Sequence, residues 1–164
     1  MVQQLLDFSK IRADVLRMDL REGDLGDIAD MVIAEVRQGH PERRIECMRE
    51  GRLQGTFDPD RMAQVLANLI GNAVIHGEPG SVIVALDGNH AQELRFAVSN
   101  RGRLPETLLP RIFEPFKGAD KPCSGLGLGL YIVDQFVRAH GGEVVAGNDA
   151  DGARFEARLP RRPS

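Results

Sequence analysis

The chain has 164 residues, enough for one globular domain with at most a short appendage. Its 21 basic and 24 acidic side chains nearly balance, which argues against a nucleic-acid-binding protein. The two cysteines, Cys47 and Cys123, lack the spacing of a metal site or a disulfide framework and predict reduced thiols in a cytoplasmic protein. Because no apolar run is long enough to span a bilayer, we expect no membrane contact by this chain, although the parent protein could be membrane-anchored.

Residues 1–16 carry apolar side chains at helical spacing and predict an amphipathic helix. We interpret it as the end of a longer helix whose first part is missing, with an ordinary packed N-terminal helix as the alternative. The domain proper is expected over residues 17–160, followed by a loose tail at 161–164.

The domain shows both helical and strand patterns. Apolar residues at helical spacing predict helices over residues 26–38, 60–75 and 128–140. Alternating residues between glycine and proline breakers predict strands over residues 18–21, 44–48, 52–58, 81–87, 93–100, 143–146 and 154–159. Asp24 and Asp60 are placed to cap the first two helices, and the turn at Glu50 and Gly51 separates two of the strands.

The order of these elements does not alternate strictly between strand and helix. It therefore favours a two-layer α/β sandwich, with helices on one side of a mostly antiparallel sheet. Residues 101–124 contain four prolines and no clear periodicity, and an irregular segment of this length is usually functional or mobile.

Three glycines alternate with leucines over residues 125–130, directly before the last predicted helix. Glycine lets the backbone approach a ligand closely, and the N-terminus of a helix favours anions. The stretch therefore predicts a phosphate cradle with ATP as the ligand class, although a tight packing point would show the same pattern.

Asn68 and Asn72 lie one turn apart in the predicted helix 60–75, and His76 follows its last turn. Residues at this spacing share a helix face, and a buried amide needs a partner. Amide oxygens suit a hard cation such as Mg²⁺. Hydrogen bonds to neighbouring strands would explain the two asparagines equally well.

Four segments together resemble, in order and spacing, the sequence boxes of sensor histidine kinases, whose catalytic domains belong to the GHKL superfamily. The matching segments are residues 64–73 (N box), 98–102 (first glycine box), 111–116 (phenylalanine box) and 125–133 (second glycine box). Residues 5–11 are similar to the end of the second helix of the family's dimerisation domain. The resemblance implies the Bergerat ATP-binding fold, a mixed, mostly antiparallel sheet packed on three helices.

The resemblance also implies roles for individual residues. Asn72 would ligate Mg²⁺ between the phosphates, and Asn68 would occupy the catalytic position where related ATPases have a glutamate. Asn100, in the same box as Gly102, would face the adenine amino group. The remaining nucleotide contacts implied are His76, Phe113, Lys117, Lys121, Gly125, Gly127, Leu128, Gly129 and Leu130.

The chain departs from the family pattern at three positions. Asn100 stands where the first glycine box normally begins with aspartate, although its side-chain oxygen can still accept a hydrogen bond from adenine. Leu104 lies close to where a second glycine is expected. Ile75 replaces a frequent lysine or arginine, which His76 could partly replace, although a plain surface histidine explains His76 equally well.

The chain's four histidines are His40, His76, His90 and His140, and none has the helical Ser-His-Glu-like context of a phosphoacceptor. We therefore expect the ATP-binding catalytic domain of a two-component sensor histidine kinase. It would present the γ-phosphate of Mg-ATP to a histidine on a dimerisation domain absent from this chain, and would not autophosphorylate alone. Expected partners are that dimerisation domain, in a homodimeric full-length kinase, and a response regulator. The alternatives are a degenerate nucleotide-binding or partner-docking module and an anti-sigma-type serine kinase.

Overall fold

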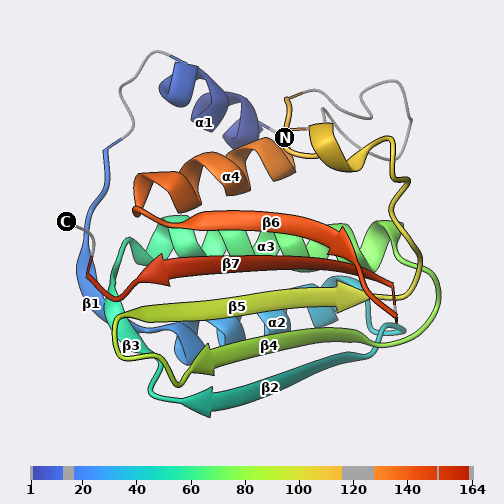
Figure 1. Cartoon of the computed structure of the whole chain (residues 1–164), viewed down its shortest axis with the longest axis horizontal. Coiled ribbons are helices and arrows are strands. Elements are labelled where there is room, and N and C mark those ends of the chain that lie inside the picture. Colours follow the sequence, from blue (N-terminus) through green and yellow to red (C-terminus); the bar gives the residue numbers. More distant parts are fainter. Residues whose placement is uncertain (1, 13–16, 116–127, 151, 163–164) are drawn as a thin grey trace.

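A computed structural model describes residues 2–12, 17–115, 128–150 and 152–162. Figure 1 shows one twisted sheet covering a layer of helices, with a small two-stranded ribbon at one end. In the described residues the helices are α1 (Val2–Arg12), α2 (Leu25–Gly39), α3 (Pro59–His76), the 3₁₀ turn η1 (Leu109–Arg111) and α4 (Gly129–Ala139). The strands are β1 (Arg21–Asp24), β2 (Ile45–Gly51), β3 (Gln54–Phe57), β4 (Val82–Gly88), β5 (Glu93–Asn100), β6 (Glu143–Asn148) and β7 (Ala153–Pro160).

The large sheet has the strand order β2-β4-β5-β7-β6. Strands β2 and β4 run parallel and the other neighbours antiparallel, which confirms the predicted mixed, mostly antiparallel sheet. The two strands expected on either side of the turn at Glu50 and Gly51 both exist, but they do not pair with each other. Strand β2 pairs with β4, whereas β3 pairs with β1 to form the separate ribbon.

The core lies between the sheet and the helices α2, α3 and α4, while α1 packs on α4. Burial alternates along β4, because successive side chains of a strand point to opposite faces of the sheet. Its inward residues Val82, Val84 and Leu86 are buried in the same cluster as Leu66 and Ile70 of α3. The predicted two-layer sandwich on three helices is therefore confirmed.

Capping residues fix where the helices begin. Asp24 caps α2 as predicted, since its carboxylate accepts a hydrogen bond from the Gly26 N–H at 2.7 Å. For α3 the prediction was wrong: the cap is Asp58, whose Oδ1 accepts from the N–H groups of Asp60 and Arg61. Proline has no N–H to satisfy and a φ suited to a first turn, so Pro59 begins the helix before Asp60.

The tail expected to be loose is anchored at its first residue. The Arg161 side chain donates to the carbonyl oxygens of His90, Gln54 and Gly88 at 2.7–2.9 Å, and only 8% of the residue is exposed. The Arg161 carbonyl in turn accepts from the Thr56 N–H. The chain after β7 is therefore hydrogen-bonded to strand β3 of the ribbon. Within the described residues, the helices are too short or too polar to cross a bilayer.

Candidate functional site

Three of the elements singled out from the sequence end at the same edge of the molecule. The C-terminus of α3, the C-terminus of β5 and the N-terminus of α4 all lie at this edge, opposite the ribbon of β1 and β3 (Figure 1). The edge therefore gathers the predicted site residues of the N box, the first glycine box and the start of the last helix.

Asn68 joins α3 to the start of α4. Its Nδ2 donates to the carbonyl oxygen of Gly129 at 3.2 Å, so the partner is the glycine-rich helix start rather than a neighbouring strand. A Cβ at Gly129 would lie 3.8 Å from the Asn68 Cγ, which places the amide directly over the glycine. At the N-cap, Leu128 is fully buried and supplies no side-chain cap, a helix start suited to an anion.

Asn72 and His76 continue along α3 toward its C-terminus. Asn72 is half-buried one turn after Asn68, as the spacing predicts. His76 is exposed at the last residue of the helix, beside Ile75, which is 55% exposed despite being apolar. The described residues hold no cluster of three His, Cys, Asp or Glu side chains that could bind a metal. Asn72 is therefore a candidate ligand only together with oxygens that a substrate and water supply.

Asn100 packs against the turn that follows α3. A Cβ at Gly77 would lie 2.6 Å from the Asn100 Nδ2, so only glycine leaves room for the amide. The Nδ2 donates to the Arg101 carbonyl oxygen at 2.7 Å, leaving Oδ1 as the acceptor that this side chain can present to a ligand. The amide position is thus set by close packing as well as by a hydrogen bond.

Gly102 needs its glycine for a conformational reason. Its φ of +99° lies in the region that other residues rarely adopt. Its carbonyl accepts from the Ala153 N–H at 2.9 Å, while the Arg101 carbonyl accepts from the Glu78 N–H at 3.0 Å. The first glycine box is therefore tied to β7 on one side and to the end of α3 on the other.

The departure at Leu104 has a structural counterpart that the sequence analysis missed. Asn148, at the end of β6, accepts from the Leu104 N–H at 2.7 Å and donates to the Leu104 carbonyl at 2.9 Å. This paired contact fixes the chain close to where the sequence analysis expected a second glycine. A lone asparagine before a turn gives no sequence signal of such a role, because its partner is 44 positions away.

Phe113 anchors the segment that follows η1. It is half-buried and meets the ring of Phe155 edge-on, with 6.3 Å between centroids, next to the buried Ile112. Leu130 is also half-buried and packs against the core. The predicted contacts Lys117, Lys121, Gly125 and Gly127 lie outside the described residues.

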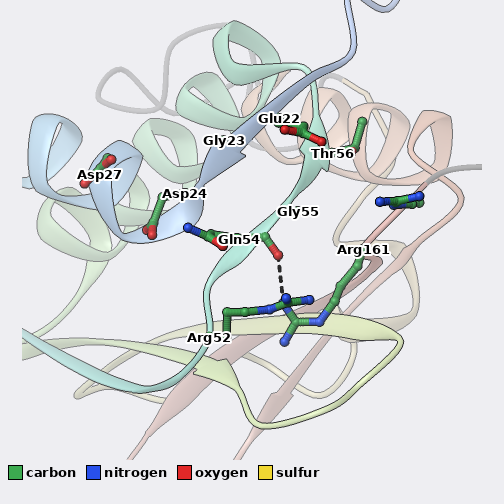
Figure 2. A pocket seen from close by; sticks show the side chains of 10 residues that line it. Glu22, Gly23, Asp24, Asp27, Arg52, Gln54, Gly55, Thr56 and Arg161 are labelled. Carbon is green, nitrogen blue, oxygen red and sulfur yellow. Dashed lines mark hydrogen bonds between the residues drawn. The ribbon is translucent and has the colours of Figure 1, made fainter.

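A hollow of about 450 Å³ lies at the opposite end of the molecule, between the ribbon and the C-terminal residues (Figure 2). Its lining mixes acidic residues such as Glu22 and Asp24 with Arg52 and Arg161. The Arg161 donors are engaged by carbonyl oxygens, and Asp24 caps α2. Two of its charged lining residues therefore have structural roles, and the hollow lies at the end of the molecule away from the candidate site.

Comparison with protein families matches residues 57–163 to the histidine kinase-, DNA gyrase B- and HSP90-like ATPases. The match covers most of the chain and includes the edge just described. The chain belongs to this family. Its predicted identity as an ATP-binding catalytic domain of the histidine kinase type is confirmed.

Known relatives agree with this assignment. The signal transduction histidine-protein kinase AfsQ2 of Streptomyces coelicolor is 33% identical over 168 residues, covering 100% of this chain and 31% of that protein. The nucleotide-free catalytic domain of histidine kinase ThkA superposes with a TM-score of 0.80 at 26% identity, covering 89% of this chain and 98% of that one. Full-length ShkA in complex with AMPPNP gives a TM-score of 0.83 at 28% identity, covering 99% of this chain and 35% of that one. The chain thus spans about a third of the length of AfsQ2.

Proposed function

We propose that this domain binds Mg-ATP at the edge formed by α3, β5 and α4 and presents the γ-phosphate to a histidine on a separate dimerisation domain. The observation that carries the proposal is the hydrogen bond from Asn68 to Gly129, which joins the N-box helix to the helix start that would hold phosphates. Asn72 lies on the same helix face, and Asn100 lies at the same edge. Phosphoryl transfer depends mostly on positioning and charge neutralisation, and such an arrangement supplies the positioning.

The proposed phosphate end combines uncharged donors with basic side chains. Backbone N–H groups of residues 127–130 would hold the phosphates, with help from the dipole of α4. Asn68 would fix that helix start relative to α3 and orient the reacting phosphate. We propose that the basic side chains of His76, Lys117 and Lys121 contact phosphate oxygens.

Mg²⁺ is the metal that fits this donor set. It typically keeps several waters and takes one or two protein oxygens together with substrate phosphates. The Asn72 amide oxygen would be its protein ligand, in keeping with the lack of an acidic cluster among the described residues. When bound, the ion would neutralise charge on the phosphates.

At the base end, Asn100 would accept a hydrogen bond from the adenine amino group through Oδ1. The Arg101 carbonyl holds the Nδ2, which supports this orientation over the flipped one. Gly102 and Phe113 would complete the floor and the outer wall of the base pocket. Replacement of the usual aspartate by Asn100 thus keeps the acceptor and removes the charge.

The partners follow from the same reading. The helix α1 would be the end of the dimerisation domain of a homodimeric kinase, and a response regulator would receive the phosphoryl group. The histidine kinase ThkA has been solved in complex with the response regulator protein TrrA. A degenerate module that docks a partner is the second candidate, favoured by the exposed Ile75 and by Leu104.

The test is calorimetry of the whole chain with ATP and Mg²⁺, for the wild type and for Asn72→Ala. We expect binding that Mg²⁺ strengthens, and a loss of that Mg²⁺-dependent part in the variant. In the same preparation, labelled ATP should leave all four histidines of the chain unlabelled. Lack of binding at millimolar ATP would favour the degenerate module, and stable phosphohistidine on the chain would contradict transfer to a separate domain.

A further inference from the structure

Helix α1 is fixed to the catalytic unit by a buried carboxylate. The Asp7 side chain is 0% exposed, and its two oxygens accept from the Arg61 Nη1 at 3.0 Å and the Gln64 Nε2 at 2.5 Å. A buried charge is costly unless it is paired and hydrogen-bonded. Any other register of α1 would take the Asp7 carboxylate away from these donors, so the contact stabilises one register only. Asp7 therefore specifies how α1 docks on α3.

Aromatic contacts extend the docking surface to α4. Phe8 meets the Tyr131 ring edge-on, with 5.5 Å between centroids, and the Arg61 guanidinium lies 4.9 Å from the centroid of Phe136. By contrast, Leu5 and Leu6 are about half exposed, so they contribute little to this contact. The docked position of α1 thus depends on Asp7, Phe8 and their partners.

Docking in this register brings the N-terminal end of α1 to the start of α4 (Figure 1). The Gln4 Nε2 lies 3.7 Å from the position that a Cβ on Gly129 would take, and the Asn68 Cγ lies 3.8 Å from the same position. Gln4, Asn68 and Gly129 therefore meet at one point, which is the phosphate end of the proposed ATP site.

We propose that α1, latched by Asp7, forms one wall of the phosphate end, and that Gln4 donates a hydrogen bond to the outermost phosphate of bound ATP. The inference rests on the proposed function. An amide N–H₂ donates hydrogen bonds and therefore suits a phosphate oxygen. Because coupling between two binding events is reciprocal, ATP would strengthen the docking of α1 as much as docking strengthens the binding of ATP.

The experiment uses the whole chain and two charge-matched variants of α1. Gln4→Glu replaces the donor by an anion of similar size, and glutamate and glutamine have similar helix propensities. Ser9→Glu adds the same charge at an exposed position of α1 and serves as the control. Calorimetry gives the affinities for Mg-ATP and Mg-ADP, and hydrogen exchange of residues 2–12 reports whether α1 is docked.

We expect Gln4→Glu to weaken Mg-ATP binding about tenfold, the usual size of a lost hydrogen bond to a charged group, and to weaken Mg-ADP binding less. Ser9→Glu should bind both nucleotides like the wild type. In the wild type, ATP should slow hydrogen exchange in α1 more than ADP does.

A second variant tests Asp7 as a positioning residue. Asp7→Asn keeps the shape and removes the buried charge, so it should release α1, speed its hydrogen exchange and lower the ATP-over-ADP preference to that of Gln4→Glu. The inference is wrong if Gln4→Glu binds ATP as Ser9→Glu does, or if Asp7→Asn releases α1 and keeps the wild-type preference for ATP over ADP. A wild-type chain that binds neither nucleotide would instead refute the proposed function itself, whatever the variants do.

Discussion

At the scale of single residues, Gly77 links the end of α3 to the base end of the site. Its φ of −76° is ordinary, so the glycine is required by space and not by conformation. A Cβ there would collide with the Ala73 carbonyl oxygen and with the Asn100 amide. The position therefore couples packing to the orientation of the side chain proposed to read adenine.

We predict that Gly77→Ala costs about 1–3 kcal/mol of unfolding free energy, because such overpacking forces neighbours to shift. It should also weaken the binding of ATP and of ADP by the same factor, because the base is common to both nucleotides. Urea unfolding and calorimetry measure the two effects. Gly39→Ala, at a glycine with nothing within 4 Å of the added Cβ, is the control. Unchanged nucleotide affinities in Gly77→Ala would show that the position of the Asn100 amide does not matter for binding the base.

At the scale of elements, Asp58 is where several segments meet. Its Oδ1 caps α3, its Oδ2 accepts from the Asp19 N–H, and its own N–H donates to the Nε2 of His140 at the end of α4. The Nδ1 of His140 lies 2.7 Å from the Phe136 carbonyl. Together these bonds require a neutral imidazole whose Nδ1 carries the proton.

This arrangement predicts a pH dependence of stability. Burial lowers the pKa of His140, outweighing the Phe136 carbonyl and the Asp58 carboxylate, which raise it. The folded state therefore binds fewer protons than the unfolded state, so the stabilisation is complete above the ordinary histidine pKa of about 6.5 and is lost as pH falls below it.

The urea midpoint of His140→Gln should fall less between about pH 8 and about pH 5 than that of the wild type. Glutamine does not titrate, so the variant loses the proton uptake by His140 that destabilises the folded wild type in this range. His76→Gln, at an exposed histidine, is the matched control and should keep the wild-type drop. Equal drops in all three proteins would show that His140 is not the titrating group.

The same elements show what sequence reasoning could reach. Apolar periodicity predicted helices α2, α3 and α4 and the strands of the large sheet, because burial on one face imposes a local repeat. The Asn148 contact with Leu104 and the pairing of β3 with β1 were missed, because each depends on a partner distant in the sequence and no local pattern records it. The Asp58 cap was also missed, although its partners are the nearby N–H groups of Asp60 and Arg61 and an aspartate directly before a proline is a local signal for a helix start.

The site follows the same division. The order of the four boxes predicted that Asn68, Asn100 and Gly129 would gather at one edge, and the structure places all three there. The involvement of Gln4 and Gly77 could not be predicted, since neither is chemically distinctive. Their importance comes from the packing of α1 on α4 and of Asn100 on the turn after α3.

At the scale of the whole molecule, the candidate site and the C-terminal anchor lie at opposite ends of the sheet (Figure 1). Arg161 holds the turn between β4 and β5, the strand β3 and the chain after β7 through three carbonyl oxygens. Arg162, its neighbour, is exposed. The two arginines therefore provide a matched pair for separating stability from nucleotide binding.

We predict that Arg161→Ala lowers the unfolding free energy by about 2–4 kcal/mol, because three buried carbonyl groups lose a charged donor. Arg162→Ala should change it by less than about 0.5 kcal/mol, as expected for a surface position. Urea unfolding measures both, and calorimetry of the folded variants should give wild-type ATP affinity, since the anchor does not touch the site. If Arg161→Ala were as stable as Arg162→Ala, the C-terminal residues would not hold the ribbon to the sheet. If instead it lost ATP affinity while folded, the two ends of the sheet would be coupled through β4 and β5, the strands that connect them.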